Sequence, residues 1–212
     1  MAIWGWIFAL VAFGMALTDW WAVFVDEKTW RFVAKPGALA ALTLLAITAS
    51  PANNTIRAWM VLGLLCSLAG DVFLLLPARW FIAGLGAFLC GHIFYVNGLL
   101  LAWESWLSAL VGLALVAVGG ATIGRVIVGG VSLYHSRLTK AVMVYLLVIS
   151  AMVVAAFGTG RPTAIFGALL FYASDAILAW NRFVNPLNNG NLAVMVTYHL
   201  GQAGLVWWAI AG

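Results

Sequence analysis

Residues 138–157 read LTKAVMVYLLVISAMVVAAF, a run of twenty residues whose only charged side chain, Lys140, lies near its start. At a rise of about 1.5 Å per residue, a helix of this length crosses the hydrocarbon core of a bilayer, which is roughly 30 Å thick. Similar apolar runs recur along the whole chain, without the alternating pattern of barrel strands. The run therefore predicts one of several membrane-spanning helices.

The composition of the whole chain indicates an integral membrane protein. Hydrophobic residues make up 66% of the 212 residues and charged residues 8%, and the mean hydropathy is +1.09. A soluble globular protein has roughly 45–50% and 25%, so ten basic and six acidic residues are too few to form a water-soluble surface. The net charge of +4 comes from basic residues scattered singly between apolar runs, which argues against nucleic-acid binding.

A window of about 19 residues predicts eight spans, and hence an all-α, polytopic membrane helical bundle in which residues 1–212 form a single domain. The connections are short and rich in Pro, Gly and Asn. No basic segment precedes the first run, so we expect a first span there and not a cleaved signal. Cys66 and Cys90 fall inside spans as small apolar side chains, and we expect no disulfide. The predicted spans are Ile3–Phe24, Val33–Ser50, Ala58–Leu76, Phe81–Ala102, Leu107–Gly124, Leu138–Phe157, Ala164–Trp180 and Asn191–Ala211.

The basic residues are divided unequally between the two sides that eight spans define. One side has only Arg57 and Arg161, whereas the loops and helix ends of the other side have Lys28, Arg31, Lys35, Arg79, Arg125, Arg137, Lys140 and Arg182. Cytoplasmic segments carry the excess of Lys and Arg, so we expect both termini outside the cytoplasm, in a bacterial inner membrane. All twelve tryptophans lie near predicted span ends, where indole prefers the interface.

Sparse polar residues recur at a nearly constant separation along the chain. The pairs, 104 to 107 residues apart, are Lys35 with Lys140, Arg57 with Arg161, Asp71 with Asp175, and His92 with His199. With four spans in each half, this pattern favours a parallel internal repeat of residues 1–104 and 105–212.

Two acidic residues, Asp71 and Asp175, lie inside predicted spans. Asp71 is about five residues before the cytoplasmic end of the third span, roughly 7–8 Å deep, and Asp175 has the matching place in the seventh span. A carboxylate in a span costs a few kcal/mol and must face the bundle interior, a partner or water. A structural ion pair could explain one such residue, but two at matching depth favour a shared functional cavity.

Polar and aromatic side chains at helical spacing are candidates for the walls of that cavity. In the fourth span His92 and Tyr95 share a face, and in the seventh Tyr172 precedes Asp175 by three residues. The candidate binding residues are His92, Tyr95, Tyr172, Tyr198 and Gln202, together with Lys35 at the start of the second span.

Other site chemistries have less support in the sequence. We expect no metal or other cofactor, because no HExxH-like pair is present, and a GxSxG nucleophile motif is absent as well. Buried carboxyls also occur in intramembrane aspartyl proteases. Those enzymes need a GxGD sequence, and Leu68 stands three residues before Asp71.

A set of short motifs follows in order along nearly the whole chain. They are Lys35-Pro36, Gly70-Asp71-Val-Phe-Leu-Leu, Phe81 with Gly84, Phe88, His92 and Tyr95, Phe171-Tyr-Ala-Ser-Asp175-Ala-Ile-Leu, and Tyr198 with Gln202. Together they resemble the YhhN/TMEM86 family, the lysoplasmalogenases. That family often has a tyrosine at the position of His199, so we do not count His199 as catalytic.

The resemblance implies a multi-pass hydrolase that cleaves the vinyl ether bond of a lysoplasmalogen, a single-chain lysophospholipid, into a fatty aldehyde and a glycerophospho-base. Such cleavage needs a proton on carbon and then attack by water, a task that two carboxyls share in glycosidases. Asp71 and Asp175 are the expected catalytic pair, and one of two neighbouring buried carboxyls can hold a proton at neutral pH. The sequence does not assign the two roles. Lys35 could meet the phosphate or act only as a snorkelling lysine.

Two other functions stay open at this point. A transporter or a lysolipid-binding membrane protein could use the same acidic cavity, since buried carboxyls also hold protons or ions in transporters. A purely structural membrane component would leave the paired aspartates unexplained.

Overall fold

The computed structural model describes residues 3–211, and within them every regular element is a helix, which confirms the all-α prediction. Two 3₁₀ turns, η1 (Ala78–Trp80) and η3 (Ser136–Leu138), precede helices, and a π turn, η2 (Gly120–Gly124), joins α5 to α6. The α-helices are α1 (Ile3–Phe24), α2 (Lys28–Thr48), α3 (Asn54–Leu75), α4 (Phe81–Leu100), α5 (Trp106–Gly119), α6 (Arg125–Tyr134), α7 (Thr139–Gly158), α8 (Pro162–Phe183) and α9 (Gly190–Ala211).

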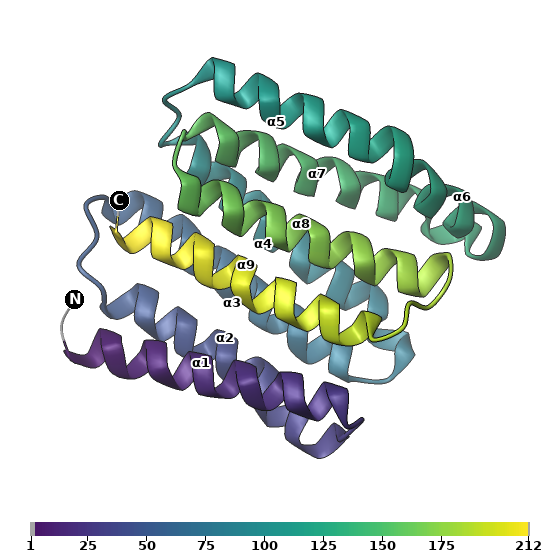
Figure 1. Cartoon of the computed structure of the whole chain (residues 1–212), viewed down its shortest axis with the longest axis horizontal. Coiled ribbons are helices and arrows are strands. Elements are labelled where there is room, and N and C mark those ends of the chain that lie inside the picture. The colour runs from purple at the N-terminus through teal and green to yellow at the C-terminus, as the bar shows by residue number, and fades with distance from the viewer. Residues whose placement is uncertain (1–2, 212) are drawn as a thin grey trace.

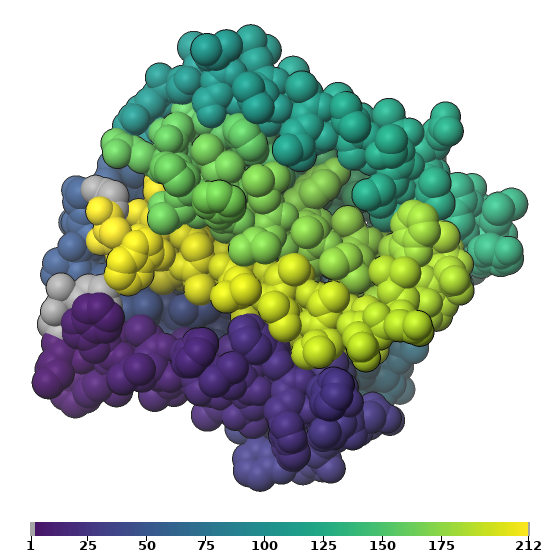
Figure 2. Space-filling view, in the orientation of Figure 1, coloured from purple at the N-terminus to yellow at the C-terminus, as the bar shows by residue number. Residues whose placement is uncertain are grey.

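The helices run back and forth along one common direction, and both ends of the chain lie at the same end of the bundle (Figure 1). Neighbours in sequence pack as antiparallel pairs, with α1 on α2, α3 on α4 and α8 on α9. Side chains of α1 and of the α5–α6 rod cover opposite edges of the molecule (Figure 2). The buried core between these edges includes Leu39, Leu64, Phe171 and Leu205.

Seven helices of the described chain are long and apolar enough to cross a membrane. The helix α9 is not one of them, because Tyr198, His199 and Gln202 lower its mean hydropathy. Those three side chains are buried inside the bundle. The multi-pass architecture is therefore confirmed, whereas the count of eight spans and the internal repeat stay predictions.

The predicted end of the fifth span at Gly124 is wrong. The helical rod continues from Trp106 to Tyr134, 29 residues in all. The backbone continues through residues 120–124 with the wider i→i+5 pattern of a π turn. As a result Arg125, which we expected at a loop or helix end, lies within the rod.

The second helix also begins earlier than predicted, at Lys28 and not at Val33. Glu27 caps it by accepting a hydrogen bond from the backbone N–H of Thr29. Pro36 lies inside this helix without ending it. The extra turn places Arg31 and Lys35 on regular helix, where both side chains can point into the bundle.

Candidate active site

A cavity of about 180 Å³ lies between α2, α3, α4, α8 and α9, near the end of the bundle opposite the chain termini. Its lining comes from the first turns of α2 and α9 and the last turns of α3 and α8. Asp71 and Asp175 both line it, as the sequence predicted for a shared cavity. The other lining residues are Arg31, Lys35, Leu74, Phe81, Phe88, Ser174, Leu178, Arg182, Asn191, Val194, Met195 and Tyr198.

Asp71 is fully buried, with an ion pair at one carboxylate oxygen and a hydrogen bond at the other. Lys35 Nζ lies 3.1 Å from its Oδ1, and the Tyr198 hydroxyl donates to its Oδ2 at 2.8 Å. The Lys35 side chain is only 5% exposed. A charge pair in such a place is stable only when both partners are present. Lys35 therefore balances the charge of Asp71, and its binding of a phosphate stays a prediction.

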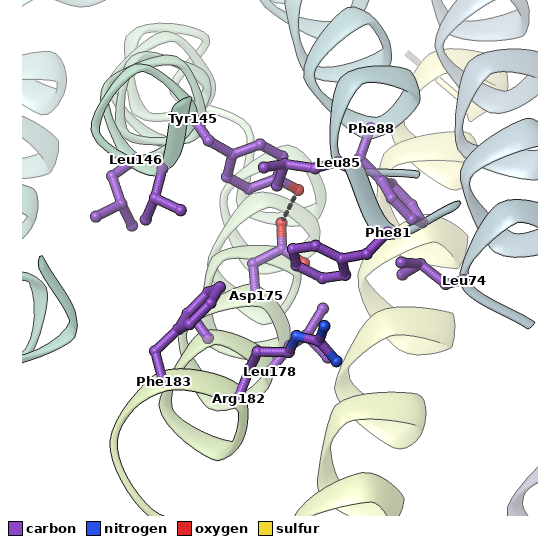
Figure 3. A pocket seen from close by; sticks show the side chains of 12 residues that line it. Leu74, Phe81, Leu85, Phe88, Tyr145, Leu146, Asp175, Leu178, Arg182 and Phe183 are labelled. Atoms are coloured by element: carbon purple, nitrogen blue, oxygen red, sulfur yellow. Dashed lines mark hydrogen bonds between the residues drawn. The ribbon is translucent and has the colours of Figure 1, made fainter. Parts of the chain in front are cut away.

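Asp175 has a different environment, with 11% of its side chain exposed. The Tyr145 hydroxyl donates to its Oδ2 at 2.5 Å (Figure 3). His92 Nε2 lies 3.1 Å from the same oxygen. No hydrogen bond from the described residues reaches Oδ1. Oδ1 is therefore the oxygen of this carboxyl that has no partner among the described residues, and the side chain lines the cavity.

An apolar hollow of about 40 Å³ adjoins Asp175 on the side of α7. Figure 3 shows the carboxyl and the Tyr145 ring at this hollow, with leucine and phenylalanine side chains around them. Phe81, Phe88 and Arg182 line both the hollow and the larger cavity. Asp175 thus lies at the boundary between the apolar hollow and the polar cavity.

The other predicted site residues fall into two groups. Tyr95 and Gln202 are buried and bonded to each other, with the tyrosine hydroxyl donating to Gln202 Oε1 at 2.7 Å, and neither lines the cavity. Tyr172 lines a separate apolar groove with α5 and α7 residues such as Val116 and Val154. The structure therefore brings together Asp71, Asp175, Lys35, His92 and Tyr198, and it places Tyr172 elsewhere.

His199, which the sequence analysis did not count as catalytic, has a partner outside the cavity. Its Nδ1 accepts a hydrogen bond from Trp20 Nε1 at 2.9 Å, which ties α9 to α1. The repeat pairs His199 with His92, but the two histidines have different partners.

Sequence reasoning missed Tyr145 and underestimated Asp19 and Arg182. Tyr145 could have been noticed as a single tyrosine in the most apolar span. Asp19 lies near the end of the first predicted span, yet its side chain is fully buried, 3.6 Å from Arg31 Nε. Within residues 3–211, no three His, Cys, Asp or Glu side chains are grouped as metal ligands would be.

The chain is similar to several proteins that share one name. The profile of the YhhN family matches residues 30–208. A protein of Mycobacterium tuberculosis named lysoplasmalogenase is 34% identical over 193 residues, which cover 88% of this chain and 69% of that protein. A protein of Sus scrofa named lysoplasmalogenase TMEM86B is 35% identical over 142 residues, covering 66% of this chain and 58% of that protein. No solved structure matches the chain.

Proposed function

The chain belongs to the YhhN family, and from this premise we propose that it is a membrane-embedded hydrolase of lysoplasmalogens. It cleaves the vinyl ether bond and releases a fatty aldehyde and a glycerophospho-base. The observation that carries the proposal is a single cavity with two unlike carboxyls, one paired with a lysine and one with a free oxygen.

Asp175 acts as the general acid in this proposal. Its Oδ1–H donates a proton to the vinyl carbon that is not bonded to the ether oxygen, and the electron pair of the double bond forms the new C–H bond. The carbon next to oxygen becomes an oxocarbenium ion, as in glycoside hydrolysis. Water adds to this carbon and returns a proton to Asp175, and the resulting hemiacetal separates into aldehyde and alcohol.

Asp71 stays ionised beside Lys35 and stabilises the positive charge of the oxocarbenium ion. Preorganised charge aimed at a developing charge is a large contribution to catalysis in a site with little water. Tyr198 holds Asp71 in place, and His92 and Tyr145 hold Asp175. Tyr95 and Gln202 support the helices behind them.

We also propose that α9 crosses the membrane as an eighth span, with both termini outside the cytoplasm. Its polar residues face the bundle, so lipid meets its apolar side. In this orientation the cavity opens toward the cytoplasmic leaflet of an inner membrane. A lysolipid in that leaflet would place its head group at the polar rim and its chain among apolar helices.

The test is aldehyde release by the purified protein from a lysoplasmalogen. Asp175→Asn should lower the rate by roughly 10²–10⁴-fold, the usual loss for a general acid. Asp71→Asn should lower it by roughly 10²–10³-fold, the usual loss for a group that stabilises charge in the transition state, while lysolipid binding persists. Asp26→Asn, in an exposed connection, is the matched control and should keep the wild-type rate. A wild-type protein that binds lysolipid but releases no aldehyde from any vinyl ether lipid would instead be a binder or transporter.

A further inference from the structure

Arg182 is a cation at the edge of the cavity with no carboxylate partner among the described residues. It lies in the last turn of α8 and lines both the polar cavity and the apolar hollow beside Asp175. Its guanidinium carbon is 4.2 Å from the centre of the Phe81 ring (Figure 3). This stacking holds the guanidinium at the rim and leaves its N–H groups available.

The other two cations that line the cavity already face carboxylates. Lys35 pairs with Asp71 at 3.1 Å, and Arg31 Nε lies 3.6 Å from Asp19 Oδ1. Within residues 3–211, Arg182 is thus the cation of this lining whose charge is not already paired with a carboxylate.

The spacing between Arg182 and Asp175 fits the proposed substrate. The two residues are seven apart on α8, which is two helical turns or about 10.5 Å along the axis, and both line the same cavity. In a lysoplasmalogen, seven bonds join the vinyl carbon that Asp175 protonates to phosphorus, an extended reach of roughly 8–9 Å. The remaining separation is taken up by the contact between Asp175 and the vinyl carbon and by the hydrogen bonds between Arg182 and the phosphate.

From this placement, and on the basis of the function proposed above, we infer that Arg182 binds the phosphate of the lysolipid and sets its vinyl ether beside Asp175. A planar guanidinium can donate two parallel hydrogen bonds to phosphate oxygens, which fixes orientation as well as position. Arg182 is then a specificity residue that separates phosphate-bearing lipids from neutral ones of the same chain length.

The experiment measures binding of two non-cleavable ligands to the purified protein. One is a lysophospholipid with a saturated ether chain, and the other is the alkylglycerol with the same chain and no phosphate. The wild type should bind the phosphate-bearing ligand about ten-fold more tightly or better, as hydrogen bonds between charged groups predict. Arg182→Gln should lose this preference and bind the alkylglycerol as before.

Two further variants control for folding and for general charge. Arg182→Lys keeps the charge but not the paired N–H groups, so it should retain part of the preference, and it replaces Arg182→Gln if that variant does not fold. Arg137→Gln removes an exposed arginine that does not line the cavity and should bind like the wild type.

The inference is overturned if the wild type binds both ligands equally, or if Arg182→Gln weakens both to the same extent. It is independent of aldehyde release, because neither ligand has a vinyl ether. A phosphate preference that depends on Arg182, in a protein that cleaves no vinyl ether, would support the binding site and refute the proposed hydrolase.

Discussion

At the scale of single residues, the ion pair of Lys35 and Asp71 makes a prediction about stability. Lys35→Met leaves the Asp71 carboxylate buried without its cation, which should cost about 3–5 kcal/mol of unfolding free energy. The double variant Lys35→Met with Asp71→Asn has no buried charge there and should recover most of the loss. Unfolding in detergent measures both variants. Equal losses in the single and double variants would show that the pair is not the source of the effect.

The hydrogen bond from Tyr145 to Asp175 makes a prediction about rate. Tyr145→Phe keeps the ring in its packing against His92 but removes the hydroxyl donor. With one of its two hydrogen-bond partners gone, the Asp175 carboxyl should be less well positioned for proton transfer. Aldehyde release should fall about five-fold, as for the loss of a neutral hydrogen bond worth about 1 kcal/mol. Tyr134→Phe, at an exposed position, should change nothing. A wild-type rate in Tyr145→Phe would remove Tyr145 from the site.

At the scale of elements, glycines bring α8 and α9 into backbone contact. A Cβ on Gly201 would lie 2.8 Å from the backbone nitrogen of Phe171, so the two helices would have to separate. Gly201→Ala should therefore destabilise the protein by about 1–3 kcal/mol. Gly14→Ala is the control, because its Cβ meets nothing within 4 Å and alanine favours a helix by about 0.5–1 kcal/mol.

The same substitution should also lower activity, because the two helices carry opposite walls of the cavity. Asp175 comes from α8 and Tyr198 from α9, and Ser174 Oγ ties them by donating to the carbonyl of Val194. Thermal unfolding and aldehyde release measured on one preparation would test both effects. A Gly201→Ala protein as stable as the Gly14→Ala control would contradict the close-packing argument.

At the scale of the whole molecule, the unequal distribution of Lys and Arg predicts the orientation in the membrane. A reporter fused at the C-terminus should indicate a location outside the cytoplasm. A reporter inserted in the turn at Ser136–Leu138 should indicate a cytoplasmic location. The two chain ends lie together at one end of the bundle, so they should report the same side. A cytoplasmic signal from the C-terminal fusion would refute this topology.

Much of the fold could be predicted from the sequence because its determinants are local. Apolar runs long enough to cross a bilayer form helices wherever they occur, since backbone groups in lipid must bond within their own segment. Asp71 and Asp175 stood out for the same reason, because a carboxylate in such a run needs a special partner. The prediction of a span end at Gly124 was wrong, because a π turn at Gly120–Gly124 continues the helix.

Only the tertiary structure decided which side chains meet in the cavity. A helix face can be read from spacing, but the neighbour that it meets depends on the rotation and order of packed helices. For this reason Lys35 turned out to pair with Asp71, Tyr145 from a distant span reached Asp175, and Tyr172 pointed into another groove. Composition and periodicity determined that this chain is a membrane helical bundle with Asp71 and Asp175 inside its spans. The contacts between helices decided which carboxyl is ion-paired and which has a free oxygen, because those contacts join residues far apart in the chain.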